Sequence, residues 1–456
     1  MLWRAADYVD SIPPLALMSK GGTCMDQTRR DFLKASSTMV MGTATNSLAI
    51  GRNAYATGDD TIRVGLIGCG GRGAGAADQA MQADPGVRLV AMADLFNSAL
   101  QAKRRILREK HPAQMMVDDD HCFVGFDGYQ RLIESGVDVV LIANASRFQA
   151  THFESCVDAG ISTFVEKPAA MDPPDVKRIL AAAEKADKKG LSVVSGQMWR
   201  YDPAVQETVK RIHDGAIGEV VAIQITTHRS NFRLRSRRPG QSEMEYQLYN
   251  WTHFSWLSGD FLTASLVHHT DLAAWVMKEE QPATAFGMGG RAALFGENHG
   301  DCFDHNAVVY EYANGGKLFA FITVQPNCYT EVSDIVMGTQ GRAYLQKGRI
   351  EGRNPWRYRD KKGNPYQIEQ NELFAAIRKG KPINNGRYMA LSAMTGIMGQ
   401  MATYTGKKIS WNEALSAGHV FGPATCDFST EPPIKPLSDG TYPVRIPGVF
   451  ALVKGR

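Results

Sequence analysis

Hydrophobic residues in the first half of the chain gather in short continuous runs, with amphipathic stretches between them. Runs of this kind, rich in Val, Ile and Leu, are typical of strands that are buried on both faces of a parallel sheet. The clearest helical stretch covers 175–190, with alanines at its centre and lysines before the glycine that ends it. The pattern predicts a doubly wound α/β domain whose ligand crevice lies at the carboxyl ends of the strands. The expected strands are 62–67, 87–92, 137–142, 161–165 and 191–194.

In the second half of the chain, strand-like runs follow one another without helices between them. Residues 307–312 and 317–324 flank Ala313-Asn314-Gly315-Gly316, a turn that suits a hairpin because Asn and Gly tolerate positive φ. This arrangement predicts a largely antiparallel sheet in an α+β domain, closed by helices over 369–379 and 389–405. The other expected strands are 220–227, 332–337 and 342–345.

A chain of 456 residues is longer than one hydrophobic core normally supports, which suggests separate domains. We expect a signal region over 1–56, a cofactor-binding domain over 57–194 and a substrate-binding domain over 195–456. The composition, 44% hydrophobic and 21% charged residues, is that of a globular protein. A net charge of +4 is close to neutral for this length, so it favours neither nucleic acid nor a membrane as a partner.

The first domain is preceded by residues that match a twin-arginine export signal, Thr28-Arg29-Arg30-Asp31-Phe32-Leu33-Lys34. An uncharged run over 35–51 follows; it is too short and too rich in Ser, Thr and Gly to span a bilayer stably. Ala54-Tyr55-Ala56 then supplies a cleavage site. We therefore expect the export machinery as a partner and a periplasmic or otherwise exported mature protein. Folding before export argues against a disulfide framework, so the cysteines are expected as buried free thiols.

Gly68-Cys69-Gly70-Gly71-Arg72-Gly73 is a dinucleotide-binding fingerprint that directly follows the first expected strand. In a Rossmann fold Gly68 permits the tight turn, Gly70 lets the backbone approach a pyrophosphate, and Gly73 lets the helix pack against the strand. The pyrophosphate lies on the helix N-terminus, beside Gly71 and Arg72. Asp94, at the end of the next strand, is placed to bind a ribose 2′-hydroxyl and to repel a 2′-phosphate. The motif predicts bound NAD rather than NADP; the alternative is a glycine-rich turn without a ligand.

Glu166-Lys167-Pro168 follows the fourth expected strand and therefore lies at the edge of the cofactor crevice. A lysine there can neutralise a developing alkoxide or donate a hydrogen bond to a sugar hydroxyl. We expect Glu166 and Lys167 beside the cofactor and Lys167 in catalysis. The alternative is a solvated surface lysine before a proline that begins a helix.

The glycine motif, the acidic Asp94 and the Glu-Lys-Pro motif together resemble the Gfo/Idh/MocA family of sugar-active oxidoreductases. Stretches such as 200–224 and 243–260 are similar to the subset allied to the NAD-dependent α-N-acetylgalactosaminidase-like glycosidases. The resemblance covers nearly all of the chain from Thr61 onward. It implies a Rossmann domain followed by an open-faced sheet, with the sugar held between them, and a cis bond before Pro168.

The resemblance also implies site residues in the second domain. A His-x-x-Asp pair, here His268 and Asp271, would face the nicotinamide; His268 would bind the substrate and carry the proton of the reacting hydroxyl. Arg200 and Tyr201 match a position near the substrate, where Tyr201 would offer its hydroxyl to the sugar; a packed corner residue is the alternative. At Ala264 the family usually has a carboxylate, and its loss puts the family's proton relay in doubt.

Three further features complete the sequence picture. The histidines and cysteines lack metal-ligand spacing, so no metal is expected. An exposed sheet face would make a homo-oligomer reasonable.

A run of arginines in the second domain is either a solvated loop or a basic rim for an acidic sugar or a sulfated polysaccharide. These arginines are Arg229, Arg233, Arg235, Arg237 and Arg238.

An exported enzyme has no free pool of NAD to exchange with, so we expect a cofactor that is held tightly and regenerated in each cycle. The expected function is a sugar-active oxidoreductase with tightly bound NAD(H), which transfers hydride at a carbohydrate hydroxyl or ketone. One alternative is a redox-neutral NAD-dependent glycosidase that proceeds by oxidation, elimination, hydration and reduction. The other is a catalytically impaired carbohydrate-binding relative, which Ala264 favours.

Overall fold

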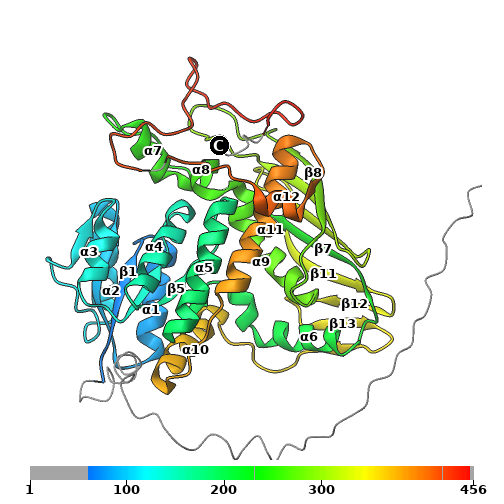
Figure 1. Cartoon of the computed structure of the whole chain (residues 1–456), viewed down its shortest axis with the longest axis horizontal. Helices are drawn as coiled ribbons and strands as arrows, with labels where there is room; N and C mark the ends of the chain where they lie inside the picture. The colour runs from blue at the N-terminus through cyan, green and yellow to red at the C-terminus, as the bar shows by residue number, and fades with distance from the viewer. Residues whose placement is uncertain (1–59, 231, 424, 452–456) are drawn as a thin grey trace, which may run out of the picture. The chain divides into compact units, whose positions relative to one another are not determined.

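The computed structural model describes residues 60–230, 232–423 and 425–451 (Figure 1). The predicted signal region, with Arg29 and Arg30, lies outside these residues. No helix in the described ranges has the length and apolar character needed to cross a membrane. The cysteines of the described ranges are free thiols, as predicted. Cys69, Cys156 and Cys302 are buried, whereas Cys122 and Cys426 are half-buried and Cys328 is exposed.

The first sheet consists of β1 (Ile62–Ile67), β2 (Val87–Asp94), β3 (Cys122–Val124), β4 (Val139–Ile142), β5 (Ser162–Val165) and β6 (Val193–Ser195). These strands are parallel and lie in the order β3-β2-β1-β4-β5-β6. All residues of β4 are buried, as expected for a strand with helices on both faces. The predicted doubly wound sheet is confirmed; the sequence pattern does not predict β3, which has only 3 residues.

Helices cover both faces of this sheet, and their ends follow local sequence signals. In α5, Asp172 caps the first turn by accepting a hydrogen bond from the Asp175 N–H, and Pro173 occupies the first turn. Gly190 ends the helix with a φ of 66°, so the predicted glycine stop is confirmed. The helices are α1 (Gly71–Ala83), α2 (Asn97–Lys110), α3 (Gly128–Glu134), α4 (Ser146–Asp158) and α5 (Pro173–Lys189).

The second sheet has 9 strands in the order β14-β13-β12-β11-β7-β10-β9-β8-β15. Neighbouring strands are antiparallel except β7 and β10, which confirms the predicted α+β domain. The predicted hairpin is present, with the Tyr312 N–H donating to the Gly316 carbonyl across the turn. The strands are β7 (Val220–His228), β8 (Thr284–Gly290), β9 (His305–Glu311), β10 (Lys317–Thr323), β11 (Glu331–Gly338), β12 (Gly341–Tyr344), β13 (Arg349–Gly352), β14 (Trp356–Arg357) and β15 (Ile409–Ser410).

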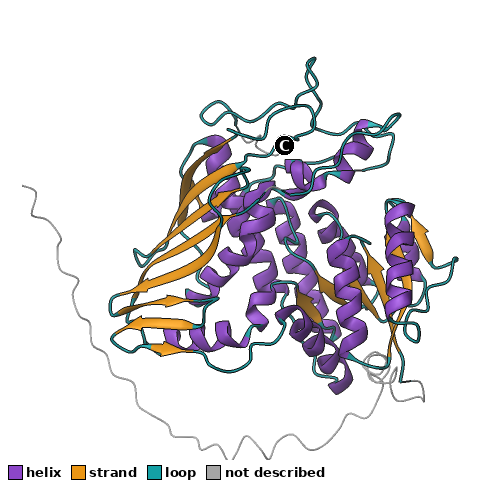
Figure 2. Ribbon diagram, turned by 180° about the vertical axis from the view of Figure 1, so that it is seen from behind, coloured by secondary structure: helices purple, strands orange, loops and turns teal. Residues whose placement is uncertain are grey.

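Two long helices, α9 (Asp260–Val276) and α11 (Gly386–Thr405), lie between the two sheets (Figure 2). Alternate residues of β10, among them Leu318 and Ala320, are buried on the side of these helices. The opposite side is open, and Met288 of β8 is 72% exposed there. The predicted homo-oligomer remains a prediction. Almost every residue of α11 is buried, because the helix packs on α5 and on β8 at once.

Segments late in the sequence return to the first domain. Helix α10 (Pro365–Lys379) packs on α1, and residues 383–385 run beside β6. The segment after α12 (Trp411–Ser416), coloured orange to red, passes over α7 (Glu243–Tyr249) and α8 (Ser255–Ser258) at the top of Figure 1. Both returns place late residues at the carboxyl ends of the parallel strands, where the site lies.

Candidate active site

The glycine motif forms the turn between β1 and α1, and the space around its glycines differs from one position to the next. Gly68 has a φ of 93°, and a Cβ there would lie 2.6 Å from the backbone of Ala143. A Cβ on Gly73 would lie 1.9 Å from the carbonyl oxygen of Gly68, so only glycine fits. By contrast, a Cβ on Gly70 or Gly71 would meet nothing within 4 Å. These two residues therefore face the open space at the N-terminus of α1, where an anion such as a pyrophosphate binds.

Asp94 lies at the end of β2, at the mouth of this turn. Its carboxylate accepts hydrogen bonds from the N–H groups of Cys69, at 2.7 Å, and Phe96, at 2.8 Å. Burial raises the pKa of Asp94 above its ordinary value. Each carboxylate oxygen has a second lone pair, so the residue can still accept a ribose hydroxyl. Its predicted choice of NAD over NADP remains a prediction.

A pocket of 340 Å³ opens beside the turn; we name it the cofactor pocket. Gly68, Gly70 and Asp94 line it, and so does Asn144, whose buried side-chain oxygen has no protein partner. An orphaned acceptor in such a pocket fits a ligand that donates hydrogen bonds. The second domain supplies part of the wall: Arg235, Leu248, Tyr249, Trp251, Pro423 and Cys426, which we name the cover. The acceptors Asp94 and Asn144 fit the hydroxyl groups of a ribose, and the open glycines fit a pyrophosphate, as a dinucleotide requires.

Arg72 and Glu166 lie beside the glycine turn as an ion pair. The Arg72 Nε donates to Glu166 Oε1 at 2.5 Å, and the guanidinium lies 4.6 Å from the ring centroid of Tyr366. Glu369 lies on the other side of Arg72, at 3.5 Å, and burial raises its pKa well above the ordinary value. These contacts fix Arg72 against α10. The roles of Arg72 and Glu166 toward a cofactor remain predictions.

Lys167 extends from the end of β5 to α9 in the second domain. Its Nζ donates a hydrogen bond to the backbone carbonyl oxygen of Ala264 at 3.1 Å. Burial lowers the pKa of Lys167; the charge of Glu166 partly opposes this shift, and the positive charges of Arg229 and Arg72 add to it. The peptide bond to Pro168 is cis, as the resemblance implies. Lys167 is therefore not a freely solvated surface lysine.

His268 lies one turn after Ala264 on the same face of α9. Its Nδ1 lies 3.2 Å from Oε1 of Gln197, a buried residue that follows β6. Burial and the charge of Lys167 hold the pKa of His268 well below 6.5, so the imidazole is neutral near pH 7. With the Gln197 oxygen accepting from Nδ1–H, the lone pair of Nε2 is available to take a proton.

Asp271, Arg200 and Tyr201 form a separate, interior network, and the structure does not bring them together with Lys167 and His268. The Asp271 carboxylate accepts two hydrogen bonds from Arg200, at 2.8 and 2.9 Å, and one from Ser392 of α11. The Tyr201 hydroxyl donates to Asn385 at 2.8 Å. Asp271 ties α9 to α11 and to the turn Met198–Tyr201, and its predicted role in catalysis remains a prediction.

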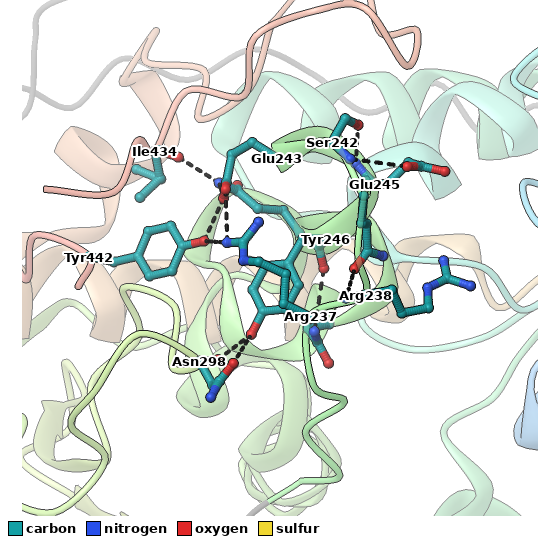
Figure 3. Close-up of polar contacts among 12 residues, drawn as sticks. Arg237, Arg238, Ser242, Glu243, Glu245, Tyr246, Asn298, Ile434 and Tyr442 are labelled. Atoms are coloured by element: carbon teal, nitrogen blue, oxygen red, sulfur yellow. Dashed lines mark hydrogen bonds and ion pairs between the residues drawn. The ribbon is translucent and has the colours of Figure 1, made fainter. Parts of the chain in front are cut away.

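The arginines of the predicted basic rim are exposed, and two of them also contact neighbouring residues of the protein. Arg235 donates to the carbonyl of Tyr249, and Arg237 pairs with Glu243 at 2.9 Å. Figure 3 shows Arg237 and Glu243 joined to the hydroxyl of Tyr442 from the C-terminal segment. These contacts hold α7 and the C-terminal segment together beside the cover.

Sequence reasoning missed two residues of this site. Gln197 follows the last strand of the parallel sheet, and that position is a usable signal because such strand ends line the crevice. Tyr366 stacks on Arg72 from the first turn of α10 and raises the pKa of Arg229. Nothing in the local sequence of Tyr366 points to the site. No group of three or more metal-ligating side chains occurs within the described part of the chain.

Several known proteins are similar to this chain in sequence, and several solved structures are similar to it in fold. The scyllo-inositol 2-dehydrogenase (NAD(+)) of Bacillus subtilis is 29% identical over 287 residues, 62% of this chain and 73% of that protein. A glycosyl hydrolase family 109 protein of Shewanella baltica is 24% identical over 313 residues, 64% of this chain and 60% of that protein. A myo-inositol dehydrogenase from Lactobacillus casei, solved with NAD(H) and myo-inositol, matches with a TM-score of 0.58 and 17% identity. That match covers 77% of this chain and 96% of the solved one.

Two family models match the chain consecutively. Residues 62–195 match the oxidoreductase family with an NAD-binding Rossmann fold, and residues 209–388 match the C-terminal α/β domain of the same family. Together they span more than half of the chain, in the order that the two sheets have in the structure. The chain therefore belongs to the Gfo/Idh/MocA family of NAD-dependent oxidoreductases.

Proposed function

We propose that this protein oxidises a carbohydrate hydroxyl, or reduces the corresponding ketone, with NAD(H) that stays bound between turnovers. The observation that carries the proposal is the contact of Lys167, which follows β5, with the Ala264 carbonyl of α9, one helical turn before His268. The charge of Arg72, in the glycine motif, acts on both Lys167 and His268. One residue supplies a positive charge and the other a neutral base, and the oxidation of an alcohol needs both.

In the oxidation direction, bound NAD⁺ would supply the acceptor for the hydride of the hydroxyl-bearing carbon, and Gly70, Gly71 and Asp94 would hold it. His268 Nε2 takes the hydroxyl proton, and the C–O single bond becomes a carbonyl. Lys167 can turn its ammonium from the Ala264 carbonyl to the reacting oxygen and stabilise the charge that develops there. Gln197 holds the imidazole in the tautomer that leaves Nε2 free. In the reduction direction the same residues act in reverse, with His268 returning the proton.

A carbohydrate substrate is supported by the relatives, among them the inositol dehydrogenases of Bacillus subtilis and Thermotoga maritima. Polyols and sugars share the reacting group, a secondary alcohol in a ring. The similarity to a glycosyl hydrolase family 109 protein supports the redox-neutral alternative, in which the hydride returns to the sugar after the glycosidic bond is broken. The third alternative is a carbohydrate-binding relative without catalytic activity, because Ala264 stands where the family usually has a carboxylate.

Retention of the cofactor is supported by the cover. Its residues come from the loop before α7, from α7 and its end, and from the C-terminal segment, so three stretches distant from the glycine motif cover one pocket. Tyr442 bonds to Arg237 and Glu243 and holds these stretches together (Figure 3). A pocket that these stretches partly cover slows exchange of the cofactor, which suits the proposed export through the twin-arginine pathway into a compartment that lacks free NAD.

The test is to release the small molecules from the purified protein by denaturation and to identify them by mass. The same preparation is then offered polyols, sugars and nitrophenyl glycosides without added NAD. Stoichiometric NAD(H), with turnover of a sugar and an acceptor sugar, supports the proposal. Hydrolysis of a glycoside with no added NAD selects the glycosidase. A protein with NAD bound but no activity on any of these compounds would contradict both.

A further inference from the structure

Arg229 is the one member of the predicted basic rim that reaches the reaction centre. It directly follows β7, and its backbone N–H donates to the Thr323 carbonyl at 3.0 Å. Its guanidinium lies 4.4 Å from the ring centroid of Phe232, and Nη1 donates to the Ser265 hydroxyl at 3.4 Å. Ser265 is adjacent to Ala264, whose carbonyl binds Lys167.

The charges around the reaction centre do not balance. Arg72 pairs with Glu166 and Glu369, and the charge of Glu166 also acts on Lys167, whose hydrogen-bond acceptor is a backbone carbonyl. Within the described ranges Arg229 makes no ion pair, and a weak hydrogen bond to Ser265 uses only one of its five N–H donors. Ala264, Ser265 and His268 of α9 carry no carboxylate. Arg229 is therefore a cation beside the reaction centre without a carboxylate partner of its own.

Arg229 is exposed, so its guanidinium is accessible to a ligand, and no carboxylate of the described ranges pairs with it. Lys167 is the buried cation of the two, and burial lowers its pKa. Arginine presents parallel N–H groups that match a carboxylate or a sulfate, and charge-assisted bonds of this kind are among the strongest in proteins. A neutral sugar would leave Arg229 without an anionic partner.

We propose that the substrate of this enzyme is an anionic sugar, whose carboxylate or sulfate group binds Arg229 while its reacting hydroxyl lies between Lys167 and His268. The inference rests on the proposed function, because it names the substrate class of that same site. Phe232 and Ser265 hold the guanidinium in place. The anionic group is bound at a distance from the reacting carbon, so Arg229 determines specificity and takes no part in proton transfer.

The test compares matched sugars on the holoenzyme and on R229Q. The probes are methyl glucuronoside against methyl glucoside, and glucose 6-sulfate against glucose. The readouts are kcat and KM from the absorbance of the bound reduced nicotinamide, and equilibrium dialysis of glucuronate and of glucose 6-sulfate without turnover. We expect R229Q to raise KM and weaken binding for the preferred acidic sugar by about 10- to 100-fold, with kcat and the neutral sugars little changed.

The matched control is R233Q, because Arg233 lies in the same loop, is exposed and makes no ion pair within the described ranges. This variant should behave as the wild type does. The carboxylate and sulfate arms show which anionic group is bound. Equal kcat/KM for acidic and neutral sugars in the wild type, or an equal loss for both in R229Q, would overturn the inference and leave the oxidoreductase intact.

A loss of bound NAD(H) in R229Q would also overturn the inference, because it would place Arg229 on the cofactor phosphates instead. Failure of the proposed function has a different signature. In that case no sugar, acidic or neutral, is oxidised or reduced by the wild-type protein. Equilibrium dialysis nevertheless shows that the acidic sugar binds to the wild type, and that it binds more weakly to R229Q.

Discussion

The ammonium of Lys167 donates to the backbone carbonyl of Ala264, and this contact joins the two domains at the reaction centre. Ala264 lies one helical turn before His268, so Lys167 contacts α9 close to the residue that we propose as the base. The family resemblance implies a carboxylate side chain at position 264. Here the helix backbone provides the hydrogen-bond partner for lysine, and position 264 itself carries no negative charge.

Introducing the absent carboxylate should change the pH dependence of the reaction. Burial and Lys167 hold the pKa of His268 well below 6.5, so we expect wild-type kcat to stay level from about pH 6 to 8 and to fall only at lower pH. In Ala264→Glu the new charge favours the imidazolium and raises the pKa of His268. The acid limb of the pH profile, where kcat falls as the pH is lowered, therefore moves to higher pH. Ala264→Gln, which adds bulk without charge, is the control. An acid limb at the same pH in both variants would contradict the electrostatic account.

Substitutions of Lys167 and His268 should lower the reaction rate without changing the amount of bound cofactor. Lys167→Met and His268→Gln are each expected to lower kcat by about 100- to 10,000-fold, the usual contribution of a positioned charge or base. The amount of NAD(H) released by denaturation should stay the same, since neither residue lines the cofactor pocket. Rates within a factor of two of the wild type in both variants would refute the site assignment.

Gln197 is expected to act through His268 rather than on the substrate. Gln197→Met removes the acceptor for Nδ1–H, and without it the imidazole populates both tautomers. We expect a loss in kcat of about 2- to 10-fold with KM unchanged, the size of one neutral hydrogen bond. Gln197→Glu keeps an acceptor and should restore the rate while moving the acid limb to higher pH. A rise in KM alone would instead place Gln197 on the substrate.

The sequence predicted the parts of the site whose positions follow from strand ends. Gly68, Asp94 and Lys167 each come directly after an apolar run, and the carboxyl ends of parallel strands meet at one edge. Local patterns therefore placed these residues correctly without knowledge of distant contacts. The glycine that ends α5 and the hairpin between β9 and β10 were predictable for the same reason, because each depends on a few neighbouring residues.

The contacts that sequence reasoning did not predict involve partners far along the chain. Asp271 is three residues from His268, yet its partners are Arg200, 71 residues away, and Ser392, 121 residues away. The spacing on α9 could not show that α11 covers that side of the helix. Tyr366 reaches Arg72 only because α10 returns to the first domain, a feature of packing that no local pattern encodes.

Asp94 should determine which dinucleotide co-purifies with the protein. Asp94→Ser removes the negative charge that would oppose a 2′-phosphate and keeps a short side chain that can accept a backbone hydrogen bond. We expect NADP(H) to appear among the released nucleotides, measured as its ratio to NAD(H) by mass analysis. Asp84→Ser, which changes a carboxylate outside the cofactor pocket, should leave the ratio as in the wild type. An unchanged ratio in Asp94→Ser would remove Asp94 from nucleotide selection.

Asp271 should matter for stability more than for chemistry. Its removal leaves the buried guanidinium of Arg200 without its main partner, and such losses typically cost about 3–5 kcal/mol in the free energy of unfolding. We expect Asp271→Ala to show this cost in urea denaturation, while Arg200→Met combined with Asp271→Leu recovers part of it. If Asp271→Ala instead kept full stability and lost turnover, the residue would belong to the reaction after all.

The C-terminal segment should control how long the cofactor stays bound. The ring of Phe428 lies 5.1 Å from that of Phe126 and 6.1 Å from that of Phe96, two residues that line the cofactor pocket. Phe428→Ala removes these contacts, each worth about 0.5–1.5 kcal/mol, so dissociation of NAD(H) should become about 2- to 10-fold faster or more. The rate is measured by exchange against isotopically labelled NAD.

The matched control for Phe428 is Val449→Ala, because Val449 lies in the same segment and is 76% exposed. It should leave the exchange rate unchanged. Tyr442→Phe is the complementary variant: it keeps the ring but removes the hydroxyl that bonds to Arg237 and Glu243, and it should also speed exchange (Figure 3). Equal exchange rates in all of these variants would mean that the cover does not retain the cofactor. The proposal that the covered pocket keeps NAD(H) bound between turnovers would then be wrong.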